Sequence, residues 1–335
     1  MRVKCFVILM ILVLTAVLSC DKGQKGEKIL RLRFSTVSVP LDAHTVCLST
    51  FKDELEKSTN GRIKVEIFHS GQLFTQEAEQ AAIRRGTIEM VYTGPNWLAD
   101  FIPYFSMFTS GYIFKDYEHM NRVLNGEIGK QIFEDVAEKI GVRPLGAFYL
   151  GTRQLNLRDI GREVRTPQDM KGIKLRMPNS PSWLFLGKAL GANPTTISFT
   201  ELYMALKTGA VDGQDNPLPT TKNAKFYEVT KYIILTNHYV NPIMPSINEK
   251  LWRKLGPELQ EKIYAAIEKA RQVCDRMNLE AEEKLVDFFK EQGMTVILPD
   301  QEAFIDYVHK AYLENDEMVA KWDMELYKKV LELSD

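Results

Sequence analysis

The fold is decided by residues 29–68, ILRLRFSTVSVPLDAHTVCLSTFKDELEKSTNGRIKVEIF. Apolar and polar residues alternate at both ends of this run, which predicts two strands with one buried face each. Between them, Cys47, Phe51 and Leu55 recur at helical spacing, and Asp42 is a suitable residue to cap the start of the helix. A strand, a helix and a second strand in this order predict a parallel pair joined by a right-handed crossover.

The same alternation of strand and helix extends outward along the chain. A helix from Thr75 to Gly86 and a strand over 88–92 complete a first series. A second series begins at Val142, with strands expected over 144–150, 173–177, 195–198, 210–212 and 232–235. Two such series predict an α/β protein of two lobes, and a cleft between two lobes is suited to close around a ligand.

A long helix is expected near the C-terminus. Gly256-Pro257 opens a segment that contains no glycine or further proline before Gly293. A helix of about 36 residues is about 54 Å long, which is more than one small lobe needs, so we expect it to span both lobes. Earlier in the chain, Ser198 and Glu201 fit a capping box for the helix that ends at Gly209.

Composition and motif content exclude several classes of protein. The chain has 335 residues and a formal net charge of −1, so it can hold two cores and offers no basic excess for nucleic-acid binding. The sequence contains no nucleophile elbow, Walker loop or dinucleotide-binding glycine motif. It contains no cysteine and histidine spacing of a zinc site. We therefore expect a protein that is not an enzyme and needs neither a cofactor nor a metal.

The N-terminus predicts export from the cytoplasm. Residues 6–18 are apolar and follow Arg2 and Lys4, which is the arrangement of a signal peptide. The apolar run is too short to span a bilayer comfortably. We therefore predict a signal peptide over residues 1–19 and a mature protein with no later membrane span.

A lipid anchor is predicted at the end of this signal peptide. Cys20 stands where bacterial lipoproteins are cleaved and acylated, although Val17 and Leu18 depart from the usual residues before the cysteine. The polar, glycine- and lysine-rich residues 20–28 then form a flexible tether. The alternative is an ordinary signal peptide followed by an incidental cysteine.

Two other cysteines, Cys47 and Cys274, lie on apolar faces of expected helices. Free cysteine behaves as a small apolar residue in a protein core, which predicts two buried thiols. One disulfide bond between them is the alternative, because an exported protein meets an oxidising compartment.

Residues 151–217 carry side chains suited to hold an organic acid. Arg176 lies near the end of a short apolar run that Pro178 closes, which places a cation at a strand end, where open α/β sheets present their ligands. The planar guanidinium group binds a carboxylate with two parallel hydrogen bonds. A lone arginine more often forms a surface ion pair, so the surrounding motifs decide between the two interpretations.

Three motifs surround this arginine: RMPN at 176–179, SFTELY at 198–203 and VDGQDNP at 211–217. In this order and at this spacing, the chain resembles the solute-binding proteins of TRAP transporters, the DctP-type family that includes the sialic-acid receptors. The resemblance extends from about residue 30 to about residue 320. It implies a two-lobed periplasmic-binding-protein fold with a long helix that spans both lobes, here in a lipoprotein version.

The resemblance also implies roles for individual residues. Arg176 corresponds to the carboxylate-binding arginine, Arg153 to a second binding arginine, Phe199 to the stacking aromatic residue and Asn216 to a binding amide. Each has an alternative role in the fold. Arg153 can form a structural ion pair, Phe199 can pack in the core, and Asn216 can form a turn before Pro217.

Departures from the sialic-acid receptors change the expected ligand. Gly94 falls where those receptors carry a glutamate that binds sugar hydroxyls, and the acidic residue expected after Gln72-Leu73 is also missing. Trp97 and Trp183 are candidates to line the cleft, or else to pack in the core. A cleft that lacks acidic side chains, and that has an apolar wall and one arginine to bind a carboxylate, favours a hydrophobic or aromatic monocarboxylate as the ligand. The predicted site is completed by Val37, Gly94 and Ser180.

The function implied by the resemblance is that of an extracytoplasmic receptor, lipid-anchored in the periplasm. It captures a small carboxylate and delivers it to the membrane permease subunits of a TRAP transporter. The alternative is a stand-alone or chemosensory carboxylate-binding lipoprotein without a permease. We assign residues 29–150 and 243–280 to lobe I, and residues 151–242 and 281–335 to lobe II.

Overall fold

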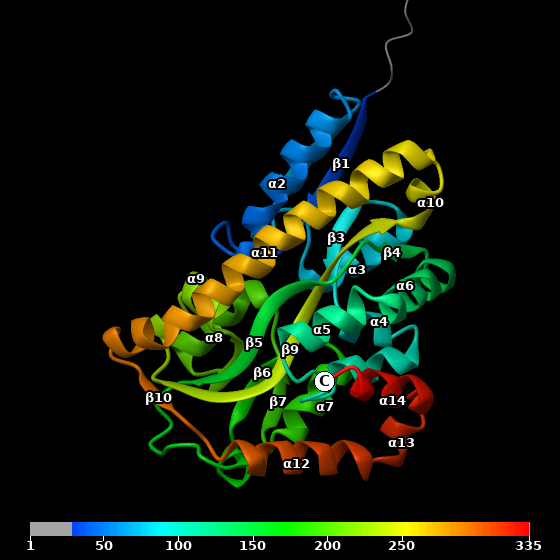
Figure 1. Cartoon of the computed structure of the whole chain (residues 1–335). Helices are drawn as coiled ribbons and strands as arrows, with labels where there is room; N and C mark the ends of the chain where they lie inside the picture. The colour runs from blue at the N-terminus through cyan, green and yellow to red at the C-terminus, as the bar shows by residue number, and fades with distance from the viewer. Residues whose placement is uncertain (1–28, 335) are drawn as a thin grey trace, which may run out of the picture.

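The computed structural model describes residues 29–334 as a mixed α/β structure (Figure 1). One ten-stranded sheet runs through it in the order β2-β1-β3-β9-β5-β8-β6-β7, and β4 and β10 pair with β9. The predicted α/β class is therefore confirmed. The strands are β1 (Leu30–Ser35), β2 (Ile63–Phe68), β3 (Met90–Thr93), β4 (Val142–Pro144), β5 (Phe148–Leu157), β6 (Lys174–Met177), β7 (Asn193–Thr196), β8 (Gly213–Pro217), β9 (Tyr232–Asn248) and β10 (Thr295–Ile297).

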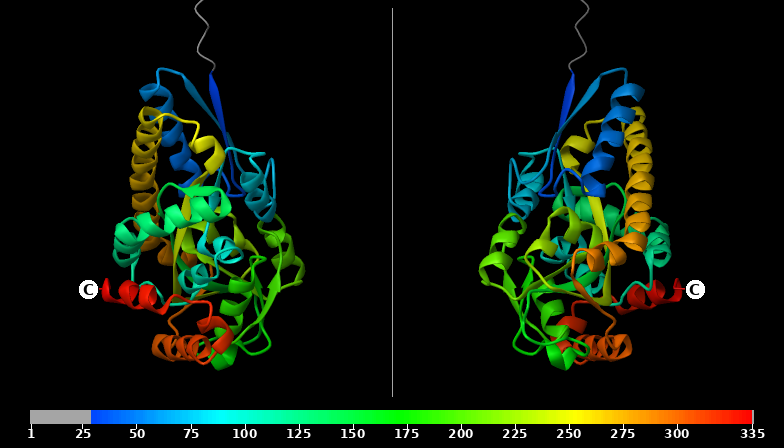
Figure 2. Two further views of the ribbon diagram at one scale, coloured as in Figure 1. Left: turned by 90° about the vertical axis from the view of Figure 1, so that its right-hand side faces the viewer. Right: turned by 90° about the vertical axis from the view of Figure 1, so that its left-hand side faces the viewer.

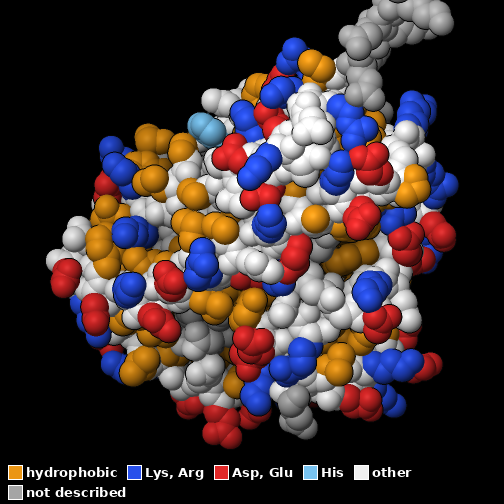
Figure 3. Space-filling model, turned by 45° about the horizontal axis from the view of Figure 1, so that its top comes forward, with side chains coloured by type: hydrophobic (Ala, Val, Ile, Leu, Met, Phe, Trp, Pro, Cys, Tyr) orange, Lys and Arg blue, Asp and Glu red, His pale blue; other side chains and the backbone are white. Residues whose placement is uncertain are grey.

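Helices pack around this sheet. Within residues 29–334, none of them combines the length and hydrophobicity needed to cross a bilayer. Charged side chains of both signs are interspersed over the face shown in Figure 3. The helices are α2 (Ala43–Ser58), α3 (Gln76–Arg85), α4 (Pro95–Ala99), α5 (Tyr117–Leu124), α6 (Glu127–Ile140), α7 (Pro181–Ala189), α8 (Leu202–Thr208), α9 (Leu218–Asn223), α10 (Glu249–Trp252), α11 (Pro257–Glu291), α12 (Gln301–Leu313), α13 (Asp316–Val319) and α14 (Met324–Glu332).

The first series of strands and helices forms as the sequence predicts. β1 pairs in parallel with β2 and with β3. Thr75 caps α3, because its side-chain oxygen accepts a hydrogen bond from the backbone N–H of Ala78 at 3.3 Å. Gly86 ends this helix in the left-handed conformation, with φ of 74°. These elements place the carboxyl ends of β1 and β3 at one edge of the sheet.

β9 is much longer than the strand predicted over 232–235. It has 17 residues, pairs with β5 over its first part and pairs with β3 through Met244 to Ile247. The length of β9 could not be predicted from the sequence, because Pro242 and Pro245 lie within the strand and proline has no N–H group to donate a hydrogen bond to a neighbouring strand. β9 is consequently one continuous strand between the part of the sheet that contains β3 and the part that contains β5.

Two local predictions were wrong. The strand expected over 210–212 lies instead at Gly213–Pro217, where three polar residues are buried and pair with β5. The capping box at Ser198 does not form, because residues 199–201 make a tighter 3₁₀ turn and α8 begins only at Leu202. The polar residues of β8 are buried in the sheet, whereas the turn over 199–201 contains no buried residue.

The predicted long helix is α11, which has 35 residues and a length of about 52 Å. It runs along one side of the molecule from α10, past α2 and β5, toward β10 (Figures 1 and 2). Cys274 on α11 and Cys47 on α2 are both fully buried and both free. The prediction of two buried thiols is therefore confirmed, and the alternative disulfide bond does not form.

α11 also supports an irregular point in β5. The pairing of β5 with β9 shifts register between Tyr149 and Gly151, and Gly151 has φ of 121°. A Cβ atom at Gly151 would lie 2.6 Å from Cβ of Pro217, so only glycine fits there. The carboxylate of Glu282 accepts hydrogen bonds from Thr152 N and from Tyr149 Oη, both at 2.6 Å. Side chains of α11 thus satisfy backbone groups that the interrupted ladder leaves free.

We predict that Glu282→Ala destabilises the protein by about 1–3 kcal/mol, because it leaves the backbone N–H of Thr152 without a partner and removes one of the two hydrogen bonds of the Tyr149 hydroxyl. Urea denaturation followed by circular dichroism measures this loss. Glu283→Ala is the matched control, because Glu283 is exposed on the next position of the same helix. Equal midpoints for the two variants would contradict the role of Glu282.

Two large apolar clusters form the interior. One joins β1, β2 and β3 to α2 and the first half of α11. The other joins β5, β6, α7 and α12 and also takes in apolar residues from 98–136. The assignment of residues 29–150 and 243–280 to lobe I, and of the remainder to lobe II, stays a prediction.

Candidate ligand-binding site

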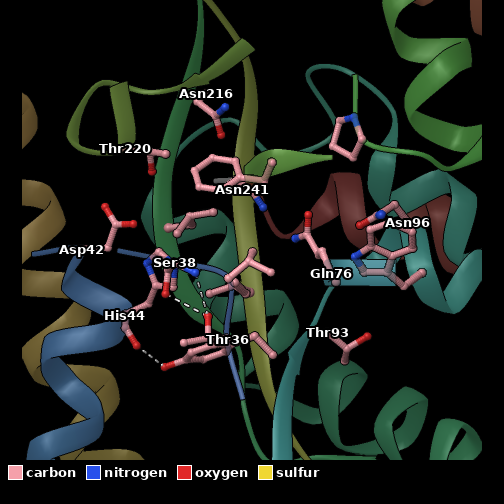
Figure 4. A pocket seen from close by; sticks show the side chains of 18 of the residues that line it. Thr36, Ser38, Asp42, His44, Gln76, Thr93, Asn96, Asn216, Thr220 and Asn241 are labelled. Atoms are coloured by element: carbon pink, nitrogen blue, oxygen red, sulfur yellow. Dashed lines mark hydrogen bonds between the residues drawn. The ribbon is translucent and has the colours of Figure 1, made fainter. Parts of the chain in front are cut away.

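A cavity lies where the loops after β1 and β3 face β5, β6, β8 and β9, and polar side chains project into it (Figure 4). Eight of the nine residues predicted for ligand binding line this cavity: Val37, Gly94, Trp97, Arg153, Arg176, Trp183, Phe199 and Asn216. Ser180 does not line it and is buried at the start of α7. The cysteine predicted to be lipidated, Cys20, lies outside the described residues.

Arg176 stands at the end of β6, where the sequence predicts it, and only 1% of its surface is exposed. Its Nε donates a hydrogen bond to the backbone oxygen of Ile197 at 2.7 Å. Its Nη2 is buried and has no hydrogen-bond partner in residues 29–334. Burial lowers the pKa of Arg176 to about 10, because the charged guanidinium has lost water, and the charge of Asp215 offsets only part of this shift.

Arg153, on β5, is held in place on three sides. Its Nε donates to Asn241 Oδ1 and its Nη1 donates to the backbone oxygen of Asp215, each at 2.7 Å. Its guanidinium carbon lies 4.3 Å from the ring centre of Trp183, which is a cation–π distance. These contacts fix the position of a second buried cation in the cavity wall.

Asp215 is the carboxylate that faces both arginines. It is fully buried, and its Oδ1 lies 3.1 Å from Nη1 of Arg153 without the alignment of a hydrogen bond. Burial alone would raise the pKa of Asp215, but the charge of Arg153 and a hydrogen bond from His238 hold it below its ordinary value. Two guanidinium groups therefore face one carboxylate, which leaves an excess of positive charge at this end of the cavity.

Aromatic residues and an amide complete this part of the wall. Trp97 and Trp183 are both buried, and Phe199 packs edge-on against Phe226 with ring centres 5.8 Å apart. Asn216 donates its amide N–H to Gln214 Oε1 at 2.5 Å, which leaves its own side-chain oxygen available to the cavity. The aromatic residues both pack in the core and line the cavity, so the two interpretations of each are compatible.

The opposite wall, from the β1–α2 loop, α3 and β3, is polar and carries two carboxyl groups. The expectation of a cavity without carboxylates is wrong, because Asp42 and Glu79 both line it and are both buried. Neither residue stands at the position of Gly94 or directly after Gln72-Leu73, where the sialic-acid receptors carry their acidic residues. Hydroxyl and amide groups accompany the carboxyl groups on this wall: Thr36, Ser38, Gln76, Thr93 and Asn96.

These two carboxyl groups are held by neutral donors. Glu79 accepts a hydrogen bond from Ser35 Oγ at 2.7 Å, and burial raises its pKa to about 8. Asp42 accepts from the Asn223 side chain at 3.0 Å and from the Val39 N–H at 3.2 Å, and burial raises its pKa to about 7. A sequence signal existed for Glu79, because it lies on the buried face of α3 with Ala82 and Ile83.

The site also contains buried polar atoms without partners in the described chain. Besides Nη2 of Arg176, these are Nδ1 of His44 and Oγ1 of Thr93, and both residues line the cavity. Residues 29–334 contain no group of three or more side chains arranged to hold a metal ion. The arrangement can bind an anion at one end and can exchange hydrogen bonds with polar groups at the other.

A buried cavity with excess positive charge, set in a two-lobed α/β fold, defines a binding protein for a small anionic solute. The chain belongs to the bacterial extracellular solute-binding proteins of family 7, the DctP family, whose model matches residues 34–317. The sialic acid-binding periplasmic protein SiaP of Vibrio cholerae is 35% identical over 269 residues, covering 80% of this chain and 83% of that protein. The 2,3-diketo-L-gulonate-binding periplasmic protein YiaO of Escherichia coli is 31% identical over 276 residues, covering 82% of this chain and 83% of YiaO.

The fold agrees with this assignment. A TRAP periplasmic solute-binding protein from Roseobacter denitrificans, solved with bound 3-deoxy-D-manno-oct-2-ulosonic acid, superposes with a TM-score of 0.87. It is 39% identical, and the match covers 91% of this chain and 99% of that one. The chain is thus a TRAP-type solute-binding protein of the periplasmic-binding-protein fold. This family works outside the cytoplasm and consists of transport proteins rather than enzymes, as the sequence predicts.

We predict that Glu79→Gln changes how stability depends on pH. The folded protein favours the protonated carboxyl group, so its stabilising contribution is complete below about pH 4.5 and is lost as the pH rises through about 8. Glutamine cannot ionise, so the melting temperature of the variant should rise relative to wild type over this interval. Calorimetry of the ligand-free proteins measures the difference. Glu138→Gln, at an exposed site on α6, is the control, and a constant difference for Glu79→Gln would contradict the prediction.

Proposed function

We propose that this protein is the receptor of a TRAP transporter for a sugar acid, a carboxylate that carries several hydroxyl groups. The observation that carries the proposal is the guanidinium of Arg176, which is buried near Arg153 and Asp215 and forms no ion pair within the described residues. A buried charge is unfavourable unless it is paired. A ligand carboxylate would supply the missing negative charge and accept from the free Nη2 atom.

The proposed ligand class replaces the hydrophobic or aromatic monocarboxylate expected from the sequence. The wall opposite the arginines carries hydroxyl, amide and carboxyl groups, with which a polyhydroxy ligand can form hydrogen bonds and an apolar ligand cannot. The named relatives bind sialic acid, 2,3-diketo-L-gulonate and 3-deoxy-D-manno-oct-2-ulosonic acid, all of which are sugar acids. Both observations support a polyhydroxy acid.

Each predicted residue has a role in this proposal. Arg176 binds the ligand carboxylate, Arg153 adds a second positive contact, and the free side-chain oxygen of Asn216 accepts a hydrogen bond nearby. Phe199 and Trp183 contact the carbon skeleton from the same end of the cavity. Ser180 lies behind the cavity wall and has no direct role.

Delivery requires the cavity to open and close. We propose that the two lobes rotate about β5, β9 and α11, and that the ligand favours the closed form because only that form brings both walls into contact with it. The closed receptor then docks on the membrane permease subunits of the transporter. A lipid at Cys20 and the tether over residues 20–28 hold the receptor near that permease after removal of residues 1–19.

We predict that Arg176→Ala weakens binding of the cognate sugar acid by about 30- to 4,000-fold, because a buried charge pair loses one partner. Arg176→Lys should also bind weakly, because an ammonium group cannot reproduce the planar fork. Isothermal titration calorimetry with N-acetylneuraminate, 2,3-diketo-L-gulonate and 3-deoxy-D-manno-oct-2-ulosonate measures both effects. Arg165→Ala, at an exposed arginine, is the control and should bind as wild type does.

Two results would overturn the proposal. The first is an Arg176→Ala protein that keeps the wild-type affinity, which would place the carboxylate elsewhere. The second is a wild-type protein that binds an apolar acid such as hexanoate and none of the three sugar acids. Thermal unfolding of each variant without ligand separates loss of binding from loss of fold.

The lipid anchor is tested separately. We predict that the full-length protein, expressed in a bacterial host, incorporates labelled palmitate and partitions into a detergent phase. Cys20→Ser should lose both properties, because the acylated residue is gone. Cys47→Ser is the matched control, since Cys47 is a buried thiol far along the chain. A Cys20→Ser protein that still carries the label would show that the anchor is wrong.

A further inference from the structure

We infer that Asp42, Glu79 and Thr93 form a subsite that binds the hydroxyl groups of the ligand, on the wall opposite Arg153 and Arg176. This inference rests on the proposed function and assigns an orientation to the ligand. The carboxylate lies against β5 and β6, and the hydroxyl-bearing carbons lie against the β1–α2 loop, α3 and β3.

The first argument is that these groups have unused hydrogen-bonding capacity. A carboxyl group offers about four acceptor sites. Glu79 accepts one hydrogen bond in the described chain, from Ser35, and Asp42 accepts two, from Asn223 and Val39. All three subsite residues are at most 2% exposed, so water reaches them only through the cavity.

The second argument is independent of the carboxyl groups. Thr93 Oγ1 is buried without a partner in residues 29–334, and so is Nδ1 of His44 on the same wall. Buried polar atoms are nearly always hydrogen-bonded in native proteins. A ligand with several hydroxyl groups can satisfy a hydroxyl and a ring nitrogen at once, because each hydroxyl group both donates and accepts.

The third argument is electrostatic. Two fully ionised carboxylates beside the cavity would repel an anionic ligand. Burial raises the pKa of Asp42 to about 7 and that of Glu79 to about 8, so each group holds a proton for much of the time near neutral pH. A protonated carboxyl group donates as well as accepts, and its residual polarity still directs the ligand carboxylate toward the arginines.

The test measures calorimetric affinities of full-length wild type and variants for two kinds of acid. The sugar acids are N-acetylneuraminate, 2,3-diketo-L-gulonate and 3-deoxy-D-manno-oct-2-ulosonate, and hexanoate is the acid without hydroxyl groups. The isosteric changes Asp42→Asn, Glu79→Gln and Thr93→Val alter one subsite group each. Asp53→Asn makes the same chemical change at an exposed position on α2 and is the control.

We expect each subsite variant to bind the preferred sugar acid about ten-fold or more weakly, because each changes a hydrogen bond at a buried position. The weak binding of hexanoate should change by less than about two-fold. Asn223→Ala removes a partner of Asp42 from the other side of the cavity, so it should weaken both kinds of acid by a similar factor. Melting temperatures without ligand identify any variant that fails to fold.

Three outcomes overturn the inference, and they are distinguishable. If wild type binds a sugar acid and the three variants keep its affinity within about two-fold, the subsite is wrong and the proposed function stands. If the variants weaken sugar acids and hexanoate equally, these residues act on closure and not on hydroxyl groups. If no sugar acid of the panel binds wild type, the proposed function and this inference both fail. Because Thr93→Val removes only a hydroxyl group, it keeps the test valid even if a carboxyl variant does not fold.

Discussion

The structure depends on one electrostatic constraint: two guanidinium groups are buried beside a single carboxylate. Removing a charge from water is expensive, and the effective cost in proteins is several kcal/mol per ion even after relaxation. The sheet register makes the arrangement possible. β8 pairs with β5 at Arg153 and with β6 at Arg176, so that β8 carries Asp215 between the two cations. The continuous pairing of three strands thus holds an unbalanced charge that side chains on loops could not hold in place.

The part of the candidate site that lies in recognisable sequence motifs could be predicted from the sequence. Arg176 precedes a proline at a strand end, and the motifs after it fix its position relative to Asn216, so the arrangement of the positive end follows from local patterns. Asp42 and Glu79 belong to no such motif, and the apolar spacing along α3 predicts only that Glu79 is buried. Their chemistry depends on which walls face each other, and a helix cap and a helical glutamate are ordinary features of a sequence.

The elements of the fold also differ in whether residues close in sequence or distant in sequence determine them. α3 and α11 follow from caps, glycines and apolar periodicity, all of which act within a few residues. β9 does not, because two prolines and several polar residues interrupt its pattern, and its 17 residues are held by partners on both sides. Tertiary pairing therefore overrides local preference where a single strand has to serve both parts of the sheet.

The contact between Asn223 and the start of α2 has a kinetic consequence. The Asn223 amide donates to Asp42 Oδ1 at 3.0 Å and to the Leu41 backbone oxygen at 3.1 Å, and so joins α9 to the opposite side of the cavity. Opening has to exchange these bonds for bonds to water, at a net change of about 0.5–1.5 kcal/mol each. In the proposed closure, these bonds would favour the closed form of the empty receptor and would lengthen the residence time of a bound ligand. For the receptor as proposed, a ligand held in this way would survive many random encounters, and parting of the two lobes at the permease would then limit the speed of uptake.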